Sequence, residues 1–234
     1  MVFPFIIPAI TGAISAITTT VAAIGPAVSS FVASIGPTLS TIAMQIKPYA
    51  EALAKFANNF LQVVDILKPG EQVTDLGERA LQGLKQDVKM EDYDTVSDYL
   101  AALRKIDVDP NVSKNRSFAE KLVSGLAVGT VALEDKLNAP EGQFNGIWLL
   151  PLANPSYFTP ERVQSLVTTG TLSSKILDYL NKGLTSGESR SFEKSLEKNE
   201  QGEPITTEQR AELYDALEAA QEKWAEISKQ VEQN

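Results

Sequence analysis

Hydrophobic residues recur at helical spacing through the first 46 residues of the chain. Bulky apolar side chains follow one another at steps of three or four residues, which places them along one face of an α-helix. They are Ile10, Ile14, Ile17, Val21, Ile24, Val28, Phe31, Ile35, Leu39, Ile42 and Ile46. Serine and threonine occupy the opposite face, where helical hydroxyls can bond to the carbonyl one turn back. The pattern predicts a buried helical segment, with these eleven residues contacting a membrane or partner subunits.

The same segment carries a proline-marked repeat of 11 residues. Ile24-Gly25-Pro26 recurs as Ile35-Gly36-Pro37 and again as Ile46-Lys47-Pro48. Eleven residues in three turns is about 3.67 per turn, so the apolar stripe stays nearly straight along the helix. Proline removes a backbone donor, and glycine before it further favours a break. The expected hinges are Gly25, Pro26, Gly36, Pro37 and Pro48.

Several arrangements would bury this segment. Residues 5–24 and 27–46 are each long enough to cross a hydrocarbon core of ~30 Å, as a helical hairpin with its tip at Gly25-Pro26. The segment could instead lie along the membrane interface. It could also form the central hairpin of a soluble bundle or be buried between subunits, because core helices can be apolar all round. A secretory signal fits less well, since no Lys or Arg precedes the apolar run.

Amphipathic helices are predicted for the rest of the chain. The stripe continues through Leu53, Phe56, Phe60 and Val63 and stops at the turn Lys68-Pro69-Gly70. Apolar spacing then predicts helices over residues 72–88, 91–106, 117–137, 160–182 (as one helix or two) and 190–199. We expect an all-α multi-helix bundle, with an apolar segment at 1–67 and an acidic helical body at 68–234.

The last predicted helix has the clearest start. Thr206 and Gln209 have the spacing of a capping box. A heptad-like seam follows, at Leu213, Leu217, Ala220, Trp224, Ile227 and Val231. We expect this short seam to pack within its own bundle in preference to a neighbouring chain.

Two further features concern packing in the body. In the predicted helix 117–137, Gly125 and Gly129 form a small-xxx-small pair that predicts a close helix crossing. Its bulky apolar positions are Phe118, Leu122, Leu126, Leu133 and Leu137.

Residues 139–160 predict a long and unusually apolar loop. Within it, Ile147–Leu150 could form a short strand. One interpretation is a loop strapped over the core by Trp148 and Phe158. The other is a second membrane- or partner-binding element made by Trp148, Leu149, Leu150 and Phe158.

The amino-acid composition excludes several kinds of functional site. The 234 residues include no cysteine and no histidine, which removes thiolate chemistry, the usual zinc ligands and the usual general base. The net charge is −9, and all of the excess lies beyond residue 67. Nucleic acid is a poor partner for such a surface, and membrane binding would have to come from apolar burial.

The remaining chemical signals are weak. Asp107, Asp109 and Asn111 resemble the first half of a calcium loop, but Val112 and Phe118 stand where glycine and a bidentate acid are needed. An Asp/Asn-rich turn that caps the next helix fits better. Ser-x-x-Lys pairs begin at Ser191 and Ser195 in a highly charged helix, where a lysine base would lack the burial it needs. We expect no enzyme activity, no cofactor and no metal.

Two functions follow from these patterns. The first is a non-enzymatic, membrane-active protein, such as a secreted toxin or effector or a phage-ejected protein. It would insert its apolar N-terminal helices into a lipid bilayer and self-associate into a pore or conduit, and would be membrane-associated after secretion or injection. The alternative is a soluble helical subunit of a virion, a secretion apparatus or a cytoplasmic assembly, with those helices buried at subunit contacts.

Overall fold

The chain is all-α in the part that the computed structural model describes. That part comprises residue 43 and residues 46–140, 143–144, 146–170, 172, 175–199 and 201–232. Within it there are ten α-helices and no strand beyond one isolated bridge between Lys198 and Pro204. The predicted helical fold class is confirmed. The predicted contact residues Ile10 to Ile42 and the hinges Gly25, Pro26, Gly36 and Pro37 lie outside the described residues.

Helix bounds are as follows. A 3₁₀ turn, η1 (Lys47–Tyr49), precedes α3 (Ala50–Val63), and η2 (Met90–Asp92) lies between α4 (Val73–Lys85) and α5 (Val96–Leu103). The remaining helices are α6 (Pro110–Lys114), α7 (Phe118–Lys136), α8 (Leu149–Ala153), α9 (Pro160–Thr168), α10 (Ile176–Leu180), α11 (Ser186–Ser195) and α12 (Thr207–Glu232).

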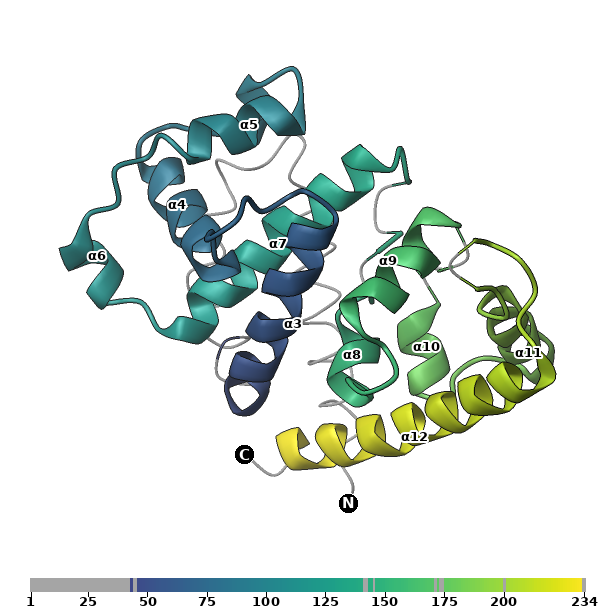
Figure 1. Cartoon of the computed structure of the whole chain (residues 1–234). Coiled ribbons are helices and arrows are strands. Elements are labelled where there is room, and N and C mark those ends of the chain that lie inside the picture. The colour runs from purple at the N-terminus through teal and green to yellow at the C-terminus, as the bar shows by residue number, and fades with distance from the viewer. Residues whose placement is uncertain are drawn as a thin grey trace.

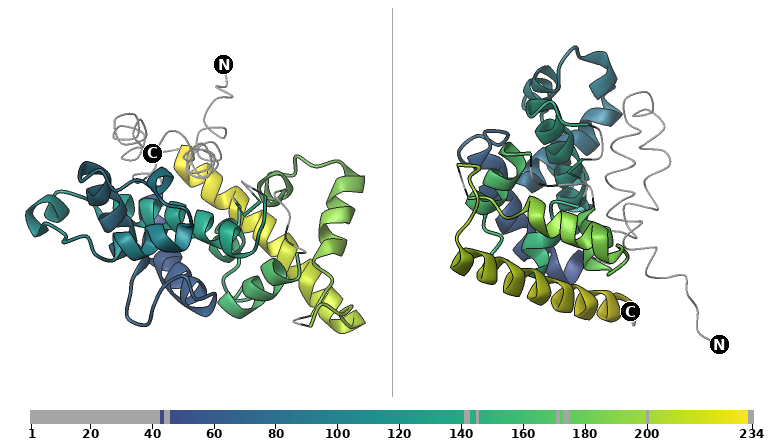
Figure 2. Two further views of the ribbon diagram at one scale, coloured as in Figure 1. Left: turned by 90° about the horizontal axis from the view of Figure 1, so that it is seen from above. Right: turned by 90° about the vertical axis from the view of Figure 1, so that its right-hand side faces the viewer.

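Helix α7 is the central element of the first half of the body, and α3 joins that half to the second (Figure 1). α7 packs against α3, α4 and α5, while α3 also contacts α8 and α9. The long helix α12 runs along one side of the molecule and packs against α8 and α10 (Figure 2). Helix α3 is therefore an integral part of the body and its core.

Glycines set how closely α4 and α7 approach. A Cβ added to Gly77 of α4 would clash with the Lys121 carbonyl oxygen of α7 and lie 2.5 Å from the Gly125 nitrogen. A Cβ on Gly125 would in turn run into the Val73 carbonyl. One turn on, a Cβ on Gly129 would lie 2.8 Å from Leu61 of α3. Of the predicted pair, Gly125 lies at the crossing with α4, and Gly129 faces the Leu61 side chain of α3.

An aromatic cluster joins α3 to the loop after α7. Phe56 and Phe60 stack with ring centroids 5.7 Å apart, and the Trp148 ring meets both edge-on at 6.3 and 5.8 Å. The Trp148 indole nitrogen donates to the Thr130 hydroxyl of α7 at 3.0 Å. Buried Trp needs such a partner for its N–H, so the bond fixes how Trp148 enters the core.

The apolar loop is consequently part of the core. Trp148, Leu149, Leu150 and Phe158 are all buried, with at most 2 % of any of them exposed. This matches the interpretation of a segment strapped over the core, and these residues offer no free surface in this structure. The strand at Ile147–Leu150 is wrong: the chain turns there and enters helix α8, which places four successive apolar residues in one compact turn.

The C-terminal helix follows its predicted start and seam. Thr206 and Gln209 exchange the two hydrogen bonds of a capping box, at 3.0 and 3.2 Å. The seam is buried from Leu213 to Trp224, and the Trp224 indole donates to Asn181 at 2.8 Å. The seam packs within its own bundle over that range, as expected.

Other predicted helices have bounds that differ from those of their apolar patterns. The 91–106 helix begins only at Val96, because Thr95 caps it through the Asp98 N–H. The 160–182 stretch divides into α9 and α10, and Gly170 has a φ of +65° where α9 ends. The 190–199 helix begins earlier, at Ser186, because Thr185 and Glu188 form a capping box there. In each case a local cap overrides the apolar spacing.

Candidate functional site

The junction between the apolar segment and the body is the candidate site. Ala43 and Ile46 are in helical conformation and buried, 3 % and 5 % exposed. Pro48 lies in η1, where a 3₁₀ turn leads directly into α3. The predicted hinge at Pro48 thus coincides with a change of helix type, and the predicted contact residue Ile46 belongs to the core of the body.

An open groove of about 410 Å³ lies beside this junction, between the start of α3 and the start of α7. Its lining residues are Ala43, Lys47, Ala50, Glu51, Ser117, Phe118, Ala119 and Glu120. Phe118 is 47 % exposed, and in the described part of the chain Val63 is the other large apolar side chain classed as exposed. The groove therefore combines small side chains that leave space with one accessible aromatic ring.

The position of Phe118 follows from the cap of α7. The Ser117 hydroxyl accepts from the Glu120 N–H, and the Glu120 carboxylate accepts from the Ser117 N–H at 2.8 Å. The Ser117 hydroxyl also donates to the same carboxylate at 2.8 Å. This capping box places Phe118 at the first helical position. The Glu120 carboxylate is thereby engaged within its own helix end.

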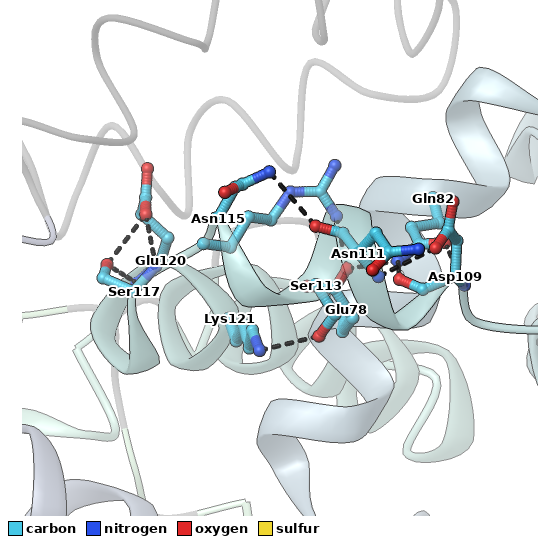
Figure 3. A network of polar contacts seen from close by, with 10 residues as sticks. Glu78, Gln82, Asp109, Asn111, Ser113, Asn115, Ser117, Glu120 and Lys121 are labelled. Atoms are coloured by element: carbon cyan, nitrogen blue, oxygen red, sulfur yellow. Dashed lines mark hydrogen bonds and ion pairs between the residues drawn. The ribbon is translucent and has the colours of Figure 1, made fainter.

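A polar network holds the segment before α7 onto α4 (Figure 3). The Arg116 guanidinium contacts the buried Glu78 carboxylate at 2.7 Å. Gln82 accepts from the Asp109 N–H at 2.9 Å and donates back to the Asp109 carbonyl at 3.2 Å. Lys121 of α7 donates to Ser113 at 2.8 Å. Together these bonds fix the α6 segment, and with it the wall of the groove that Phe118 occupies.

The hydrogen bonds of this network have structural roles. Asp109 caps α6 by accepting from the Asn111 N–H at 2.8 Å, as expected of an Asp/Asn-rich turn. Among the residues described, no three His, Cys, Asp or Glu side chains are placed to hold a metal. The Ser191 and Ser195 hydroxyls donate to carbonyls of their own helix, those of Gly187 and Phe192. Both serine hydroxyls are thus bonded within their own helix.

The sequence identified part of this site. The predicted contact residue Ile46 and the predicted hinge Pro48 both lie at the junction. Phe118 was missed as a surface residue, because its spacing is the same as that of the buried Leu122 and Leu126. The signal that could have marked it is Ser117-x-x-Glu120, since a capping box puts the next residue at the very start of the helix.

Comparisons of the chain with family models, curated proteins and solved structures found no match. None of the helices that the structure describes is both long and apolar enough to cross a membrane.

Proposed function

We propose that this chain is a non-enzymatic, membrane-active protein that inserts its apolar N-terminal helices into a bilayer and self-associates there into a pore or conduit. It would act after secretion or injection and be membrane-associated in that state. The supporting observation is the contrast across Lys47. Forty-six residues without a charge precede it, and a folded acidic body with its own enclosed core follows.

Energetics support apolar burial as the driving force. The net charge of −9 gives no attraction to anionic lipid headgroups, so long-range electrostatics oppose binding. Each bulky residue of the stripe contributes about 1.5–3 kcal/mol when it is fully buried. Ser, Thr, Ala and Gly on the other faces allow close helix contact, which favours association of several copies in the membrane.

The test uses the full chain and zwitterionic vesicles, so that added positive charge brings no lipid attraction of its own. Flotation and dye release are compared for wild type and for Ile14→Lys/Ile24→Lys/Ile35→Lys, which places three charges on the stripe. The matched control, Thr19→Lys/Ser30→Lys/Thr41→Lys, places the same charges on the hydroxyl face. A truncation variant lacks residues 1–42. It stops before α3, because Phe60 and Leu61 of that helix are fully buried in the core of the body and must be kept.

We expect wild type to float and release dye, and the stripe variant and the truncation to stay in solution. Binding by the control variant indicates a segment lying in the interface, whereas loss in both lysine variants indicates spanning helices. Wild-type protein that folds and stays off the vesicles would contradict the proposal.

The alternative is a soluble helical subunit of a virion or secretion apparatus. The groove supports this alternative, because an exposed Phe118 beside small side chains also suits a subunit contact. This function would be supported if wild-type protein does not bind vesicles but sediments as a defined oligomer. The stripe substitutions should then abolish that oligomer.

A further inference from the structure

We propose that the groove between α3 and α7 is the resting seat of the protein's own apolar segment. The residues just before Ala43, Leu39 and Ile42 among them, would pack against Phe118 and leave the groove when the segment meets lipid. This inference rests on the proposed function and adds a regulated state to it.

Chain connectivity is the first argument. Ala43 lines the groove, and the chain that precedes it is covalently joined to the groove at that residue. A tethered segment of a few residues has an effective concentration in the millimolar range. A foreign partner of equal intrinsic affinity would have to exceed that concentration to take the same surface.

The chemistry of the two surfaces is the second argument. The groove offers Ala50, Ala119 and the exposed Phe118 ring. Of its charged lining residues, Lys47 and Glu51 are exposed to solvent, and the Glu120 carboxylate is engaged in the α7 cap. The segment before Lys47 has no charge to desolvate. Contact between them therefore buries apolar area on both sides without stranding a buried charge.

Size is the third argument. At about 410 Å³ the groove is in the range of sites that hold a small ligand, and it suits a few bulky side chains from one helical turn. The groove thus holds the C-terminal end of the apolar segment. Releasing that end would free the segment to move about the expected hinge at Pro48, which lies between it and α3.

Disulfide trapping tests the seat directly, because the native chain has no cysteine. Thr38→Cys is paired with Glu51→Cys, which lines the groove, and the control pairs Thr38→Cys with Asn59→Cys, an exposed residue two turns along the same helix. In dilute protein, we expect the first pair to form an intramolecular cross-link roughly tenfold faster, equivalent to about 1.4 kcal/mol of docking. Phe118→Ser should reduce that rate to the control value without loss of helicity.

A second readout tests release. The cross-linked protein should leave dye-filled vesicles intact until a reductant is added, and Phe118→Ser should speed dye release. Equal cross-linking rates for the two pairs would overturn the seat, as would disulfide-linked dimers as the main product, which would place a second copy in the groove. Dye release unaffected by the cross-link would overturn its regulatory role. Because cross-linking is measured without lipid, its result stands apart from the membrane proposal.

Discussion

Gly77 of α4 and Gly125 of α7 lie backbone against backbone where these two helices cross. A Cβ on Gly77 would lie 2.5 Å from the Gly125 nitrogen, and a Cβ on Gly125 would run into the Val73 carbonyl. Backbone cannot swing aside as a flexible side chain can, so any larger residue must separate the two helices.

Gly125→Ala should therefore destabilise the body by about 3 kcal/mol, at the upper end for overpacked cores. Urea unfolding followed by circular dichroism measures this. Gly187→Ala in α11 is the matched control, because no atom lies within 4 Å of the added Cβ. There alanine should be neutral or stabilise by up to about 1 kcal/mol. Similar midpoints for the two variants would mean that the crossing is looser than described.

The buried ion pair gives a second prediction. Glu78 is 4 % exposed, and one of its carboxylate oxygens has no hydrogen-bond partner, so Arg116 is its main neutralising contact. Arg116→Met should cost about 3–5 kcal/mol, because it strands a buried charge. Adding Glu78→Leu should restore much of that loss.

The exposed pair Lys223–Glu226 is the control for that cycle, and Lys223→Met should cost less than about 1 kcal/mol. A double variant Glu78→Leu/Arg116→Met no more stable than Arg116→Met alone would argue against a stranded charge as the cause.

The bond between Trp148 and Thr130 gives a third prediction. Thr130 is fully buried and provides the acceptor for the indole N–H. Thr130→Val keeps the shape but leaves that donor unsatisfied, which should cost about 1–3 kcal/mol in urea unfolding. Thr168→Val, at an exposed hydroxyl that bonds to its own helix, should change stability by less than about 0.5 kcal/mol. Equal small effects would show that the indole finds another acceptor.

Acid should weaken the contact between Glu71 and Arg104. Burial raises the pKa of Glu71, but hydrogen bonds from Arg104 and the Lys68 N–H outweigh it and hold the pKa below its ordinary value of 4.5. The carboxylate therefore stabilises the fold fully above about pH 4.5, and this is lost as the pH falls through the lower, folded-state pKa.

Glu71→Gln should accordingly cost about 1 kcal/mol at neutral pH, and the difference from wild type should shrink as the pH drops below the ordinary glutamate pKa. Unfolding free energies measured across that pH range test this. In an Arg104→Met background the same substitution should show a weaker pH dependence. A difference that grows in acid would reverse the sign and contradict the assignment.

Local sequence signals predicted much of the fold. The helix at 117–137 and the cap at Thr206 were recovered closely, since helical spacing and capping boxes act over a few residues. The burial of Trp148 and Phe158 was one of two interpretations. A hydrophobic pattern indicates that a segment is buried, but it does not identify the residues against which the segment packs. Phe56 and Phe60, against which Trp148 packs, lie some 90 residues earlier in the chain.

The groove could not be predicted from the sequence, for a similar reason. Phe118 is spaced like a core residue, and only the three-dimensional path of the α6 segment turns the start of α7 toward solvent. That path depends on Gln82 and Arg116 meeting partners more than 25 residues away. Gly77 also carried no signal in isolation, because a glycine in a helix shows its purpose only when the crossing helix is known.

The placement of α12 has a consequence for the order of synthesis. The first half of the body can pack as soon as α7 has emerged, but α8 and α10 receive their cover from the last helix of the chain. At ribosomal rates of about 5–20 residues per second, roughly ten to forty seconds separate the appearance of residue 46 from that of residue 232. During that interval the apolar segment is already outside the ribosome while its body is unfinished. A nascent-chain chaperone, or prompt docking on α3 and α7, would be needed to keep it from aggregating.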